Sequence, residues 1–267
     1  MKIFLSVFLC LFLLSCLCIA YDVKSSEIQS IIKKYDGKIP EYWKETVPGV
    51  IAHFNAPEKV IALTFDACGR SKRSSSYDAK LIDFLCENKI PATLFITSLW
   101  IKANPEIFKE LAKNPLFEIA NHGANHLPCS VNGNSAYGIK GTKNIPALIH
   151  EVLGNKELIE ELTGKTPRFY RSGTNYYDEI AVRIVYDLGQ IPVGYSVLGD
   201  AGATYNQDQV KAALLSAKSG DIVIMHMNHP EGETAEGVIA AIPILKEQGF
   251  KFEKLSLVLG LTQRPKN

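Results

Sequence analysis

Short apolar runs of strand type alternate with segments of helical periodicity along most of this chain. In the first half the strand-like runs are Val60–Phe65, Ala92–Ile96 and Phe117–Ala120, and the helical segments are Asp78–Glu87, Pro105–Lys113 and Ile145–Leu162. In the second half the strand-like runs are Arg168–Tyr170, Pro192–Val197, Asp221–His226 and one near Phe252, separated by the helical segments Asp178–Leu188, Gln207–Ala217 and Ala235–Gln248. About seven strand–helix units of this kind predict an α/β fold in which a parallel sheet closes into a distorted (β/α) barrel.

Helix-start signals support two of the helical segments. Asn104, Pro105 and Glu106 follow one another as a capping residue, a first-turn proline and a first-turn acid. Thr234 stands in a capping position before Ala235. We therefore expect one helix to begin after Asn104 and another after Thr234.

The N-terminus has the pattern of a secretory signal peptide. Lys2 precedes the apolar run Ile3–Leu14, in which Ser6 is the one polar residue, and small residues and cysteines follow it. The run is shorter than the roughly 20 apolar residues that a transmembrane helix needs. Leu13–Cys16 resembles a lipobox that would leave a lipid anchor on Cys16, whereas Cys18–Ala20 resembles an ordinary cleavage site, which we favour. Both readings predict export to the periplasm, the cell envelope or the medium, where disulfides persist.

Charge and length place the exported part among ordinary globular domains. The chain has 29 basic and 28 acidic residues, and removal of residues 1–20 takes away only Lys2, which leaves 28 of each sign. A balanced charge of this kind gives no support for nucleic acid as a partner. We expect a signal peptide over 1–20, a preamble over 21–55 that packs on the barrel without recognisable chemistry, and one catalytic domain over 56–267.

Polar residues with catalytic chemistry follow several of the strand-like runs. They are Asp66 after the first, His122 and His126 after the third, Arg171 after the fourth, Asp200 after the fifth and His226 at the end of the sixth. In a parallel barrel the loops after the strands converge on one rim, so we expect these side chains to meet there. An acid and two histidines four residues apart could hold a metal ion or an activated water, which is typical of a hydrolase.

Each of these residues also has a purely structural reading. The acid could cap a turn, the loop histidines could bond to backbone carbonyls, the strand-end histidine could be a satisfied buried side chain, and the arginine could form a structural ion pair. His229 could contact a sugar, act as a spare ligand or remain solvated. The position of the other residues at one predicted rim favours the functional reading.

Four short motifs occur in a fixed order over roughly residues 60–252 and resemble those of a known family. Thr64–Ala67, read as Thr-Phe-Asp-Ala, resembles the first motif, Thr-Phe-Asp-Asp, of the NodB-like polysaccharide deacetylases of carbohydrate esterase family 4. His122 and His126 resemble the second motif, in which two histidines lie four residues apart. Arg171 matches the arginine that opens the third motif, and His226 matches the histidine that ends a strand in the fifth. The resemblance implies the distorted barrel of the NodB homology domain.

The resemblance also implies a role for each matched residue. Asp66 would take a proton from the attacking water, His226 would protonate the departing amine, and Arg171 would pair with Asp66. His122 and His126 would bind a divalent metal, zinc or cobalt, that polarises the acetamide carbonyl.

The implied reaction is hydrolysis of an N-acetyl group on GlcNAc or MurNAc in a polysaccharide such as peptidoglycan or chitin-like oligomers, with release of acetate. The backbone N–H of Thr174 would stabilise the oxyanion, with Asp200 and His229 as candidate supporting residues. In one loop, Arg70, Lys72 and Arg73 could contact an anionic group of the substrate or stay solvated. In a second loop, Tyr137 could stack on a sugar ring.

The chain departs from the family pattern at several positions. Ala67 stands where the family has a second Asp, its third metal ligand, and a methyl group cannot coordinate an ion. Gly123 stands where Ser or Thr is usual, and Leu198 lies about where the family places an Asp, a loss for which Asp200 could compensate. Two alternatives stay open: a catalytically silent carbohydrate-binding relative, and a hydrolase of another acyl or amide bond. Retention of the acid–base pair and the arginine argues against the silent relative.

Three cysteines remain after removal of residues 1–20. Cys86 lies in an apolar helical segment, whereas Cys68 and Cys129 follow the first two site motifs closely. Because both motifs end at the same predicted rim, we expect a disulfide between Cys68 and Cys129 that joins the two loops. The rival hypothesis is that one of the two thiolates replaces the missing carboxylate as a soft ligand for zinc.

Overall fold

The computed structural model describes residues 25–56 and 58–260, which belong to two compact units. Residues 25–35 form a helix in the first unit, which ends at Ile39, and the second unit begins at Pro40. The predicted signal peptide over 1–20, with its lipobox at Cys16, lies outside the described residues. Within them, no helix combines the length and the apolar content that crossing a membrane requires.

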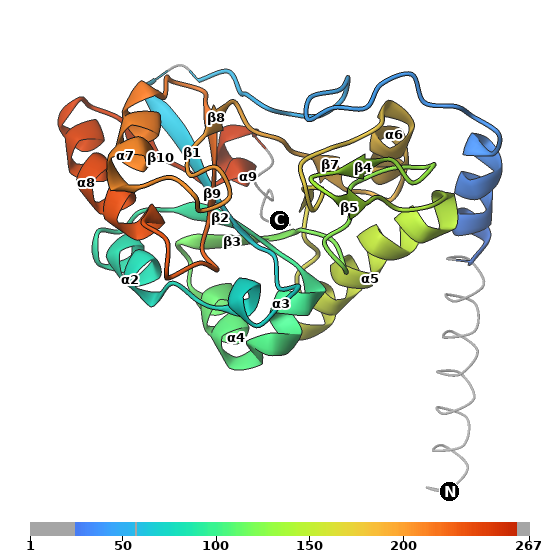
Figure 1. Ribbon diagram of the computed structural model, residues 1–267, viewed down its shortest axis with the longest axis horizontal. Helices are drawn as coiled ribbons and strands as arrows, with labels where there is room; N and C mark the ends of the chain where they lie inside the picture. The colour runs from blue at the N-terminus through green and yellow to red at the C-terminus, as the bar shows by residue number, and fades with distance from the viewer. Residues whose placement is uncertain (1–24, 57, 261–267) are drawn as a thin grey trace, which may run out of the picture. The chain divides into compact units, whose positions relative to one another are not determined.

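Strands and helices alternate in the second unit, as the sequence predicts (Figure 1). The strands are β1 (Val60–Ala67), β2 (Ala92–Ile96), β3 (Phe117–Asn121), β4 (Ser135–Ala136), β5 (Ile139–Lys140), β6 (Phe169–Tyr170), β7 (Ile191–Pro192), β8 (Val197–Leu198), β9 (Ile222–His226) and β10 (Lys251–Phe252). The helices are α2 (Ala79–Glu87), α3 (Ser98–Ala103), α4 (Pro105–Lys113), α5 (Ile145–Thr163), α6 (Glu179–Asp187), α7 (Gln207–Ser216), α8 (Thr234–Glu247) and α9 (Leu255–Val258), with a 3-10 turn, η1 (Arg73–Ser75). The hairpin of β4 and β5 and the short helix α3 are additions to the predicted pattern.

The main sheet is parallel, with strand order β7-β6-β3-β2-β1-β9-β8 and β10 paired to β1. The distorted (β/α) barrel is confirmed, but strand pairing leaves it open, because β7 and β8 form its two edges. Residues 51–54 lie across this opening: the N–H of Ile51 donates to the Pro192 carbonyl, and the N–H of Phe54 donates to the Gly220 carbonyl. Part of the segment before β1 therefore contacts both sides of the opening.

One predicted strand, Pro192–Val197, is instead two strands at opposite edges of the sheet. β7 pairs with β6 and β8 pairs with β9, so the residues between them carry the chain across the opening. The carbonyl oxygens of Val193 and Gly194 accept hydrogen bonds from the side chain of Arg171 at 3.3 and 2.9 Å. Because these carbonyls bind a guanidinium, they do not continue a strand ladder at this point.

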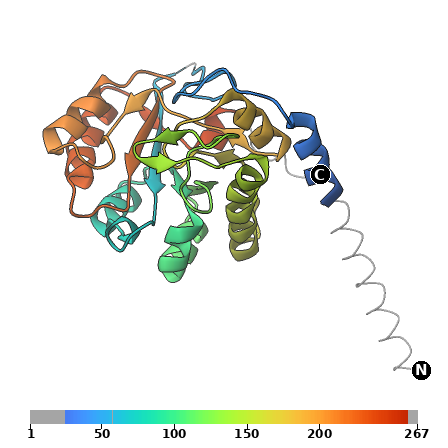
Figure 2. The ribbon, with the colours of Figure 1, turned by 45° about the vertical axis from the view of Figure 1, so that its right-hand side comes forward.

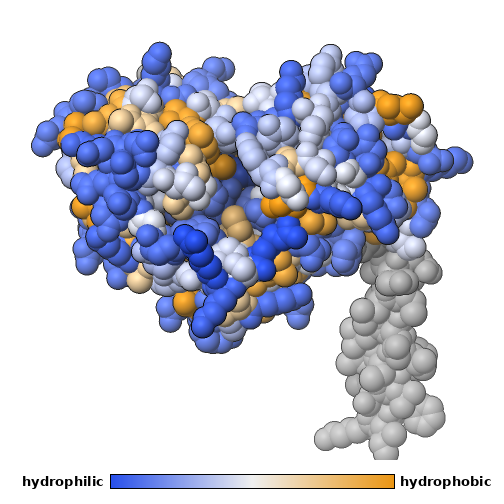
Figure 3. Space-filling model, in the orientation of Figure 1, coloured by the Kyte–Doolittle hydropathy of each residue, from blue (hydrophilic) through white to orange (hydrophobic). Residues whose placement is uncertain are grey.

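Both faces of β1 are buried, which is characteristic of a parallel strand covered on each side. Ile61, Leu63, Phe65 and Ala67 belong to the large core shared with the helices, whereas Ala62 belongs to a second core inside the curled sheet. Figures 1 and 2 show α2, α4 and α5 along one side of the sheet. Figure 3 shows that the face of the second unit seen in this view is mostly hydrophilic, with apolar residues in patches. Alternation along β1 directs Asp66 to the inside.

The two helix-start signals lead to different contacts. α4 begins at Pro105 as predicted, but the side chain of Asn104 makes no capping bond and donates instead to the carbonyl of Ser75 at 2.8 Å. α8 includes Thr234 as its first residue, and the Thr234 hydroxyl donates to Asp200 Oδ2 at 3.0 Å. Thr234 therefore connects the start of α8 to one of the predicted rim residues.

Candidate functional site

The predicted rim residues meet at the carboxyl ends of the strands. Strand register pairs Asp66 of β1 with His226 of β9, so their side chains start from adjacent positions. β3 ends directly before His122, and β6 ends directly before Arg171. A cavity of about 530 Å³ opens there, and its lining includes Asp66, His226, Cys68, His126 and Thr174. His122 and Arg171 are buried behind this lining.

Arg171 holds Asp66 in place from inside the curled sheet. Its Nη1 donates to Asp66 Oδ1 at 2.7 Å and to the hydroxyl of Thr64 at 3.0 Å, and its guanidinium lies 4.1 Å from the ring centre of Phe95. Arg171 and Asp66 are both buried, at 0% and 2% exposure. A charge-assisted hydrogen bond in such surroundings fixes the carboxylate strongly. It leaves the second oxygen, Oδ2, for contacts on the side of His122.

Cys68, His122 and His126 form a cluster whose ligand atoms all lie within 4.8 Å of one another. Ala67 points into the helix-covered core, and Cys68 comes directly after the end of β1 and faces the cavity. The rings of His122 and His126 meet edge to face, with centroids 4.9 Å apart. One sulfur and two imidazole nitrogens are a donor set that suits a divalent metal such as zinc.

The hydrogen bonds of His122 also indicate a cation in this cluster. Its Nδ1 lies 3.0 Å from the carbonyl oxygen of Arg171, which can only accept, so Nδ1 carries the proton. Its Nε2 then faces Asp66 Oδ2 at 3.5 Å and Cys68 Sγ at 4.0 Å, two further electron-rich atoms. In addition, Nδ1 of His126 is buried with no hydrogen-bond partner among the described residues. A metal ion, or a proton on the His122 ring, relieves this repulsion, so the residues present fit a metal.

The pKa shifts follow from the same packing. Burial raises the pKa of Cys68, but the imidazoles of His126, His122 and His226 outweigh it, so the pKa lies well below that of an ordinary thiol. Burial lowers the pKa of His122, but Asp66 and Cys68 outweigh it and raise the value above the ordinary one. A thiolate is the form of cysteine that binds metals.

The predicted disulfide between Cys68 and Cys129 is wrong, since both are free thiols. Cys68 faces the imidazoles, whereas the backbone of Cys129 forms a bridge with Tyr177 and its N–H donates to the Ser172 hydroxyl at 3.0 Å. The Cys129 thiol is fully buried beside Tyr170, and burial raises its pKa well above the ordinary value. The loop after β3 therefore carries Cys129 into the core and away from Cys68.

Asp200 supports His226 on the other side of the cavity. Its two oxygens lie 2.9 Å from His226 Nδ1 and 2.6 Å from the backbone nitrogen of the same residue. Burial alone lowers the pKa of His226, but the Asp200 carboxylate outweighs it and raises the pKa well above the ordinary value. Burial raises the pKa of Asp200, but His226 outweighs it and lowers the value. The pair therefore favours a protonated imidazole beside an ionised carboxylate.

Of the remaining predicted residues, some line the cavity and others lie outside it. Thr174 lines the cavity. A Cβ on Gly173 would lie 2.3 Å from the carbonyl carbon of His126, so glycine allows the Thr174 loop to pack directly on the histidine loop. His229 does not belong to the lining; its Nδ1 contacts Glu231 at 2.9 Å, and Arg73 forms an ion pair with the same carboxylate.

Sequence reasoning missed two glutamates. Glu45 lines the cavity, although it comes from the preamble, for which the sequence predicts no chemistry, and no local pattern marks it. Glu151 of α5 is 1% exposed and accepts hydrogen bonds from the backbone N–H groups of Asn125 and Leu127, on both sides of His126. An acid within the buried stripe of a helix was the signal for Glu151.

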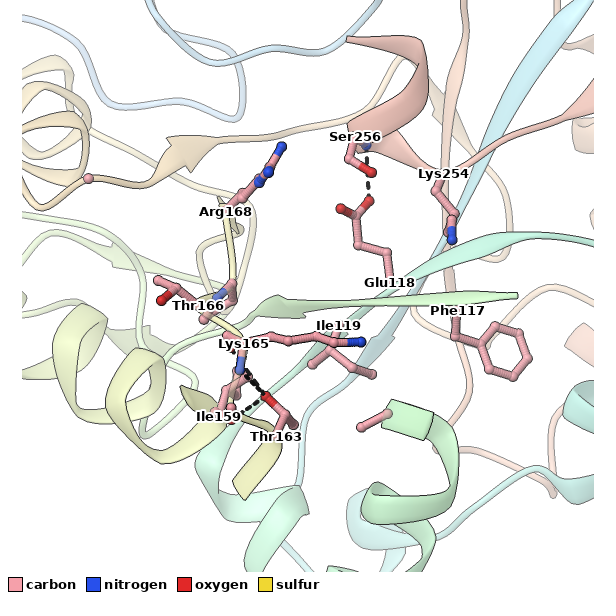
Figure 4. A pocket seen from close by; sticks show the side chains of 14 residues that line it. Phe117, Glu118, Ile119, Ile159, Thr163, Lys165, Thr166, Arg168, Lys254 and Ser256 are labelled. Atoms are coloured by element: carbon pink, nitrogen blue, oxygen red, sulfur yellow. Dashed lines mark hydrogen bonds between the residues drawn. The ribbon is translucent and has the colours of Figure 1, made fainter. Parts of the chain in front are cut away.

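A second, larger cavity of about 710 Å³ lies near the opposite ends of β3 and β6 (Figure 4). Lys165, Arg168 and Lys254 contribute to its lining. Figure 4 shows the Glu118 carboxylate directed at Ser256, whose backbone N–H donates to it at 3.0 Å. Among the described residues that line this cavity there is no histidine, cysteine or aspartate, whereas Asp66, Cys68, His126 and His226 line the smaller cavity.

Comparisons with known proteins identify the family to which this fold belongs. Residues 53–193 match a family model described as polysaccharide deacetylase. The chain is 28% identical over 222 residues to a peptidoglycan-N-acetylglucosamine deacetylase of Bacillus cereus, which covers 81% of this chain and 96% of the relative. It is 25% identical over 234 residues to a peptidoglycan-N-acetylmuramic acid deacetylase of Bacillus subtilis, covering 86% of this chain and 77% of the relative. A solved CE4 family pseudoenzyme of Bacillus anthracis shares the fold, with a TM-score of 0.66 at 20% identity over 81% of this chain and 70% of that one.

Proposed function

Because the chain belongs to the polysaccharide deacetylase family, we propose that it hydrolyses the N-acetyl group of an amino sugar, GlcNAc or MurNAc, in a polysaccharide. Peptidoglycan and chitin-like oligomers are the candidate polymers, and the names of the relatives from Bacillus cereus and Bacillus subtilis support peptidoglycan. The observation that carries the proposal is the convergence of Asp66, His226 and the Cys68 cluster on one cavity. We also propose export from the signal-peptide pattern of residues 1–20, and export would bring the protein to a polymer of the cell envelope.

The cluster of Cys68, His122 and His126 would hold the divalent metal, for which we propose zinc or cobalt. A metal bound there would supply Lewis-acid polarisation of the acetamide carbonyl. Cys68 takes the place of the carboxylate that is missing at Ala67, because a thiolate serves as a third protein ligand as well as a carboxylate does. This choice agrees with the rival hypothesis for the cysteines and not with the disulfide.

Asp66 is the proposed general base. Its Oδ1 is held by Arg171 at 2.7 Å, so the carboxylate keeps one orientation while it accepts a proton from the water that attacks the carbonyl carbon. The new C–O bond places negative charge on the carbonyl oxygen, for which the backbone N–H of Thr174 is the proposed donor.

His226 is the proposed general acid. As the C–N bond breaks, its ring donates a proton to the departing nitrogen, which leaves as the free amine of the sugar while acetate is released. Asp200, 2.9 Å from Nδ1, keeps this imidazole protonated and oriented. One proton thus moves from water to Asp66, and another moves from His226 to the amine.

Acetate release from N-acetylglucosamine oligomers and from peptidoglycan tests the proposal, with and without a chelator and added zinc or cobalt. The Asp66→Asn variant should lose about 10²- to 10⁴-fold in turnover while it still binds sugar, since the amide cannot act as a base. Asp83→Asn, on the exposed face of α2, is the matched control and should keep full activity. Turnover of Asp66→Asn at the wild-type rate would place the base elsewhere, and activity after complete chelation would remove the metal role.

Sugar binding by the wild-type chain without any acetate release would contradict hydrolysis and support the silent relative. Release of acetate only from O-acetylated sugars would instead indicate another acyl substrate. The buried pairing of Asp66 with Arg171 and of His226 with Asp200 favours the hydrolase, because binding alone needs neither pair.

A further inference from the structure

Glu45 brings a carboxylate into the wall of the catalytic cavity. The hydroxyl of Tyr137 donates to its Oε1 at 2.7 Å, and the hydroxyl of Tyr195 donates to its Oε2 at 2.8 Å. The three residues come from the segment before β1, the turn between β4 and β5, and the segment after β7, and all of them line the cavity together with Asp66 and His226. Contacts between such distant segments hold the carboxylate in a defined position.

Glu45 forms no ion pair within the part of the chain that the structure describes. Across residues 25–56 and 58–260, no lysine, arginine or histidine forms an ion pair with it. Each of its oxygens accepts one phenol, and an ionised carboxylate offers about four acceptor positions, so further hydrogen bonds from a ligand are available. The hydrogen bond to Glu45 raises the pKa of Tyr137, which keeps this phenol a donor.

Aromatic rings continue from Tyr137 away from Glu45. Tyr137 is 72% exposed, and its ring meets that of Tyr176 edge to face with centroids 5.5 Å apart. The Tyr176 ring in turn lies 5.6 Å from that of Trp43. Rings that already contact one another lose little freedom when a sugar stacks on them. Tyr137 thus connects the Glu45 carboxylate in the cavity wall to an aromatic platform of Tyr176 and Trp43 next to the cavity.

We propose, on the basis of the deacetylase function above, that Glu45 and the rings of Tyr137, Tyr176 and Trp43 form a sugar subsite selective for uncharged rings of the N-acetylglucosamine type over rings that bear a carboxylate. A ligand carboxylate about 6 Å from Glu45 would be repelled enough to lower affinity about tenfold in partly hydrated surroundings. Arg73, a candidate anion contact in the sequence, is paired with Glu231 and does not line the cavity.

The test uses one glycan in two charge states. A peptide-free MurNAc-containing glycan is compared with the same glycan after its lactyl carboxylates have been converted to neutral amides. Binding to the full chain is measured by calorimetry, and acetate release is measured in parallel. Wild-type protein should prefer the neutral glycan about tenfold, and the preference should shrink as added salt screens the repulsion.

Glu45→Gln should improve binding and turnover of the anionic glycan. The ratio of affinities for the neutral and the anionic glycan should therefore fall close to one. Glutamine has the same size and can still hydrogen-bond both tyrosines, so the change removes charge with little loss of shape. Glu58→Gln, an exposed residue that pairs with Lys251, is the matched control and should keep the wild-type ratio. Tyr137→Ala should raise KM about threefold to tenfold with kcat unchanged, because this ring touches none of the proposed reacting groups.

The two possible failures are distinguishable. Suppose that acetate is released, but that neither Glu45→Gln nor added salt changes the ratio of affinities for the neutral and the anionic glycan. This result would overturn the charge-selective subsite and keep the deacetylase function. A binding preference that disappears in Glu45→Gln, together with no acetate release from either glycan, would keep the subsite and overturn the deacetylase.

Discussion

At the scale of single residues, the direction of two neighbouring side chains decides which of them can contribute to the proposed metal site. Ala67 is the last residue of β1 and packs into the core under the helices, whereas Cys68 lies beyond the strand and faces the cavity. We therefore propose that the Cys68 thiolate offsets the loss of a carboxylate at position 67. Asp66, one residue before Ala67, is held by Arg171 at 2.7 Å.

Removal of the Cys68 thiol should weaken metal binding. Cys68→Ala leaves two imidazoles as protein ligands, and we expect zinc affinity to fall by at least about tenfold to a hundredfold. The cobalt form of the wild-type protein should show sulfur-to-cobalt charge-transfer absorption that Cys68→Ala lacks. Cys86→Ala, on α2 and outside the cluster, should retain both the affinity and the absorption band. An unchanged band in Cys68→Ala would exclude this thiolate as a ligand.

Asp200 should set the upper pH limit of catalysis. His226 acts as an acid only while protonated, and Asp200 raises its pKa, so activity should persist above the ordinary pKa of a histidine and fall once pH exceeds the raised value. Asp200→Asn removes the charge and lowers that pKa, so the alkaline limb of the kcat/KM profile should move to lower pH by about one unit or more. Asp208→Asn, in the first turn of α7, should leave the limb in place. A limb that stays unchanged in Asp200→Asn would contradict the role of His226.

At the scale of elements, α5 organises the loop that carries both histidines. The Glu151 carboxylate accepts the backbone N–H groups of Asn125 and Leu127, between which His126 has a positive φ of 58°. Gly123, also at positive φ, has no space for a side chain, because a Cβ would lie 2.4 Å from Glu151 Oε1. The absence of the usual Ser or Thr at position 123 thus follows from the buried glutamate.

Glu151→Gln should loosen this loop. The amide replaces one acceptor oxygen with a donor that faces backbone N–H groups, so we expect the free energy of unfolding to fall by about 1–3 kcal/mol and metal affinity to fall with it. Denaturant unfolding and metal titration measure the two effects. Glu161→Gln, on the exposed side of the same helix, should change neither. Full stability and affinity in Glu151→Gln would show that the loop holds its shape without the carboxylate.

At the scale of the whole molecule, packing rather than a cross-link joins the catalytic loops. Arg171 contacts Asp66 of β1 and the carbonyls of Val193 and Gly194, so one buried side chain connects segments from three parts of the chain. Residues 51–54 lie across the opening of the barrel. The site therefore depends on contacts between segments far apart in sequence.

The cysteines give a direct test of this arrangement. Denatured, unreduced protein from residue 21 onward should contain three free thiols, and reductant should leave the Tm of the native protein unchanged. In the native state Cys129 should react last, because its side chain is fully buried. Two missing thiols, recovered after reduction, would restore the disulfide hypothesis.

Short-range patterns in the sequence determined the alternation of strands and helices and the order of residues at the rim. Asp66 and His226 lie in the last residues of β1 and β9, and His122 directly follows β3. Parallel strands bring their carboxyl ends to one edge whatever the details of packing. Only the tertiary structure decided that Cys68 faces imidazoles, that Glu45 reaches the cavity and that Pro192–Val197 divides into two strands. The reason is physical: periodicity reports which residues are buried within one element, whereas side-chain direction and partner choice depend on contacts with segments distant in sequence.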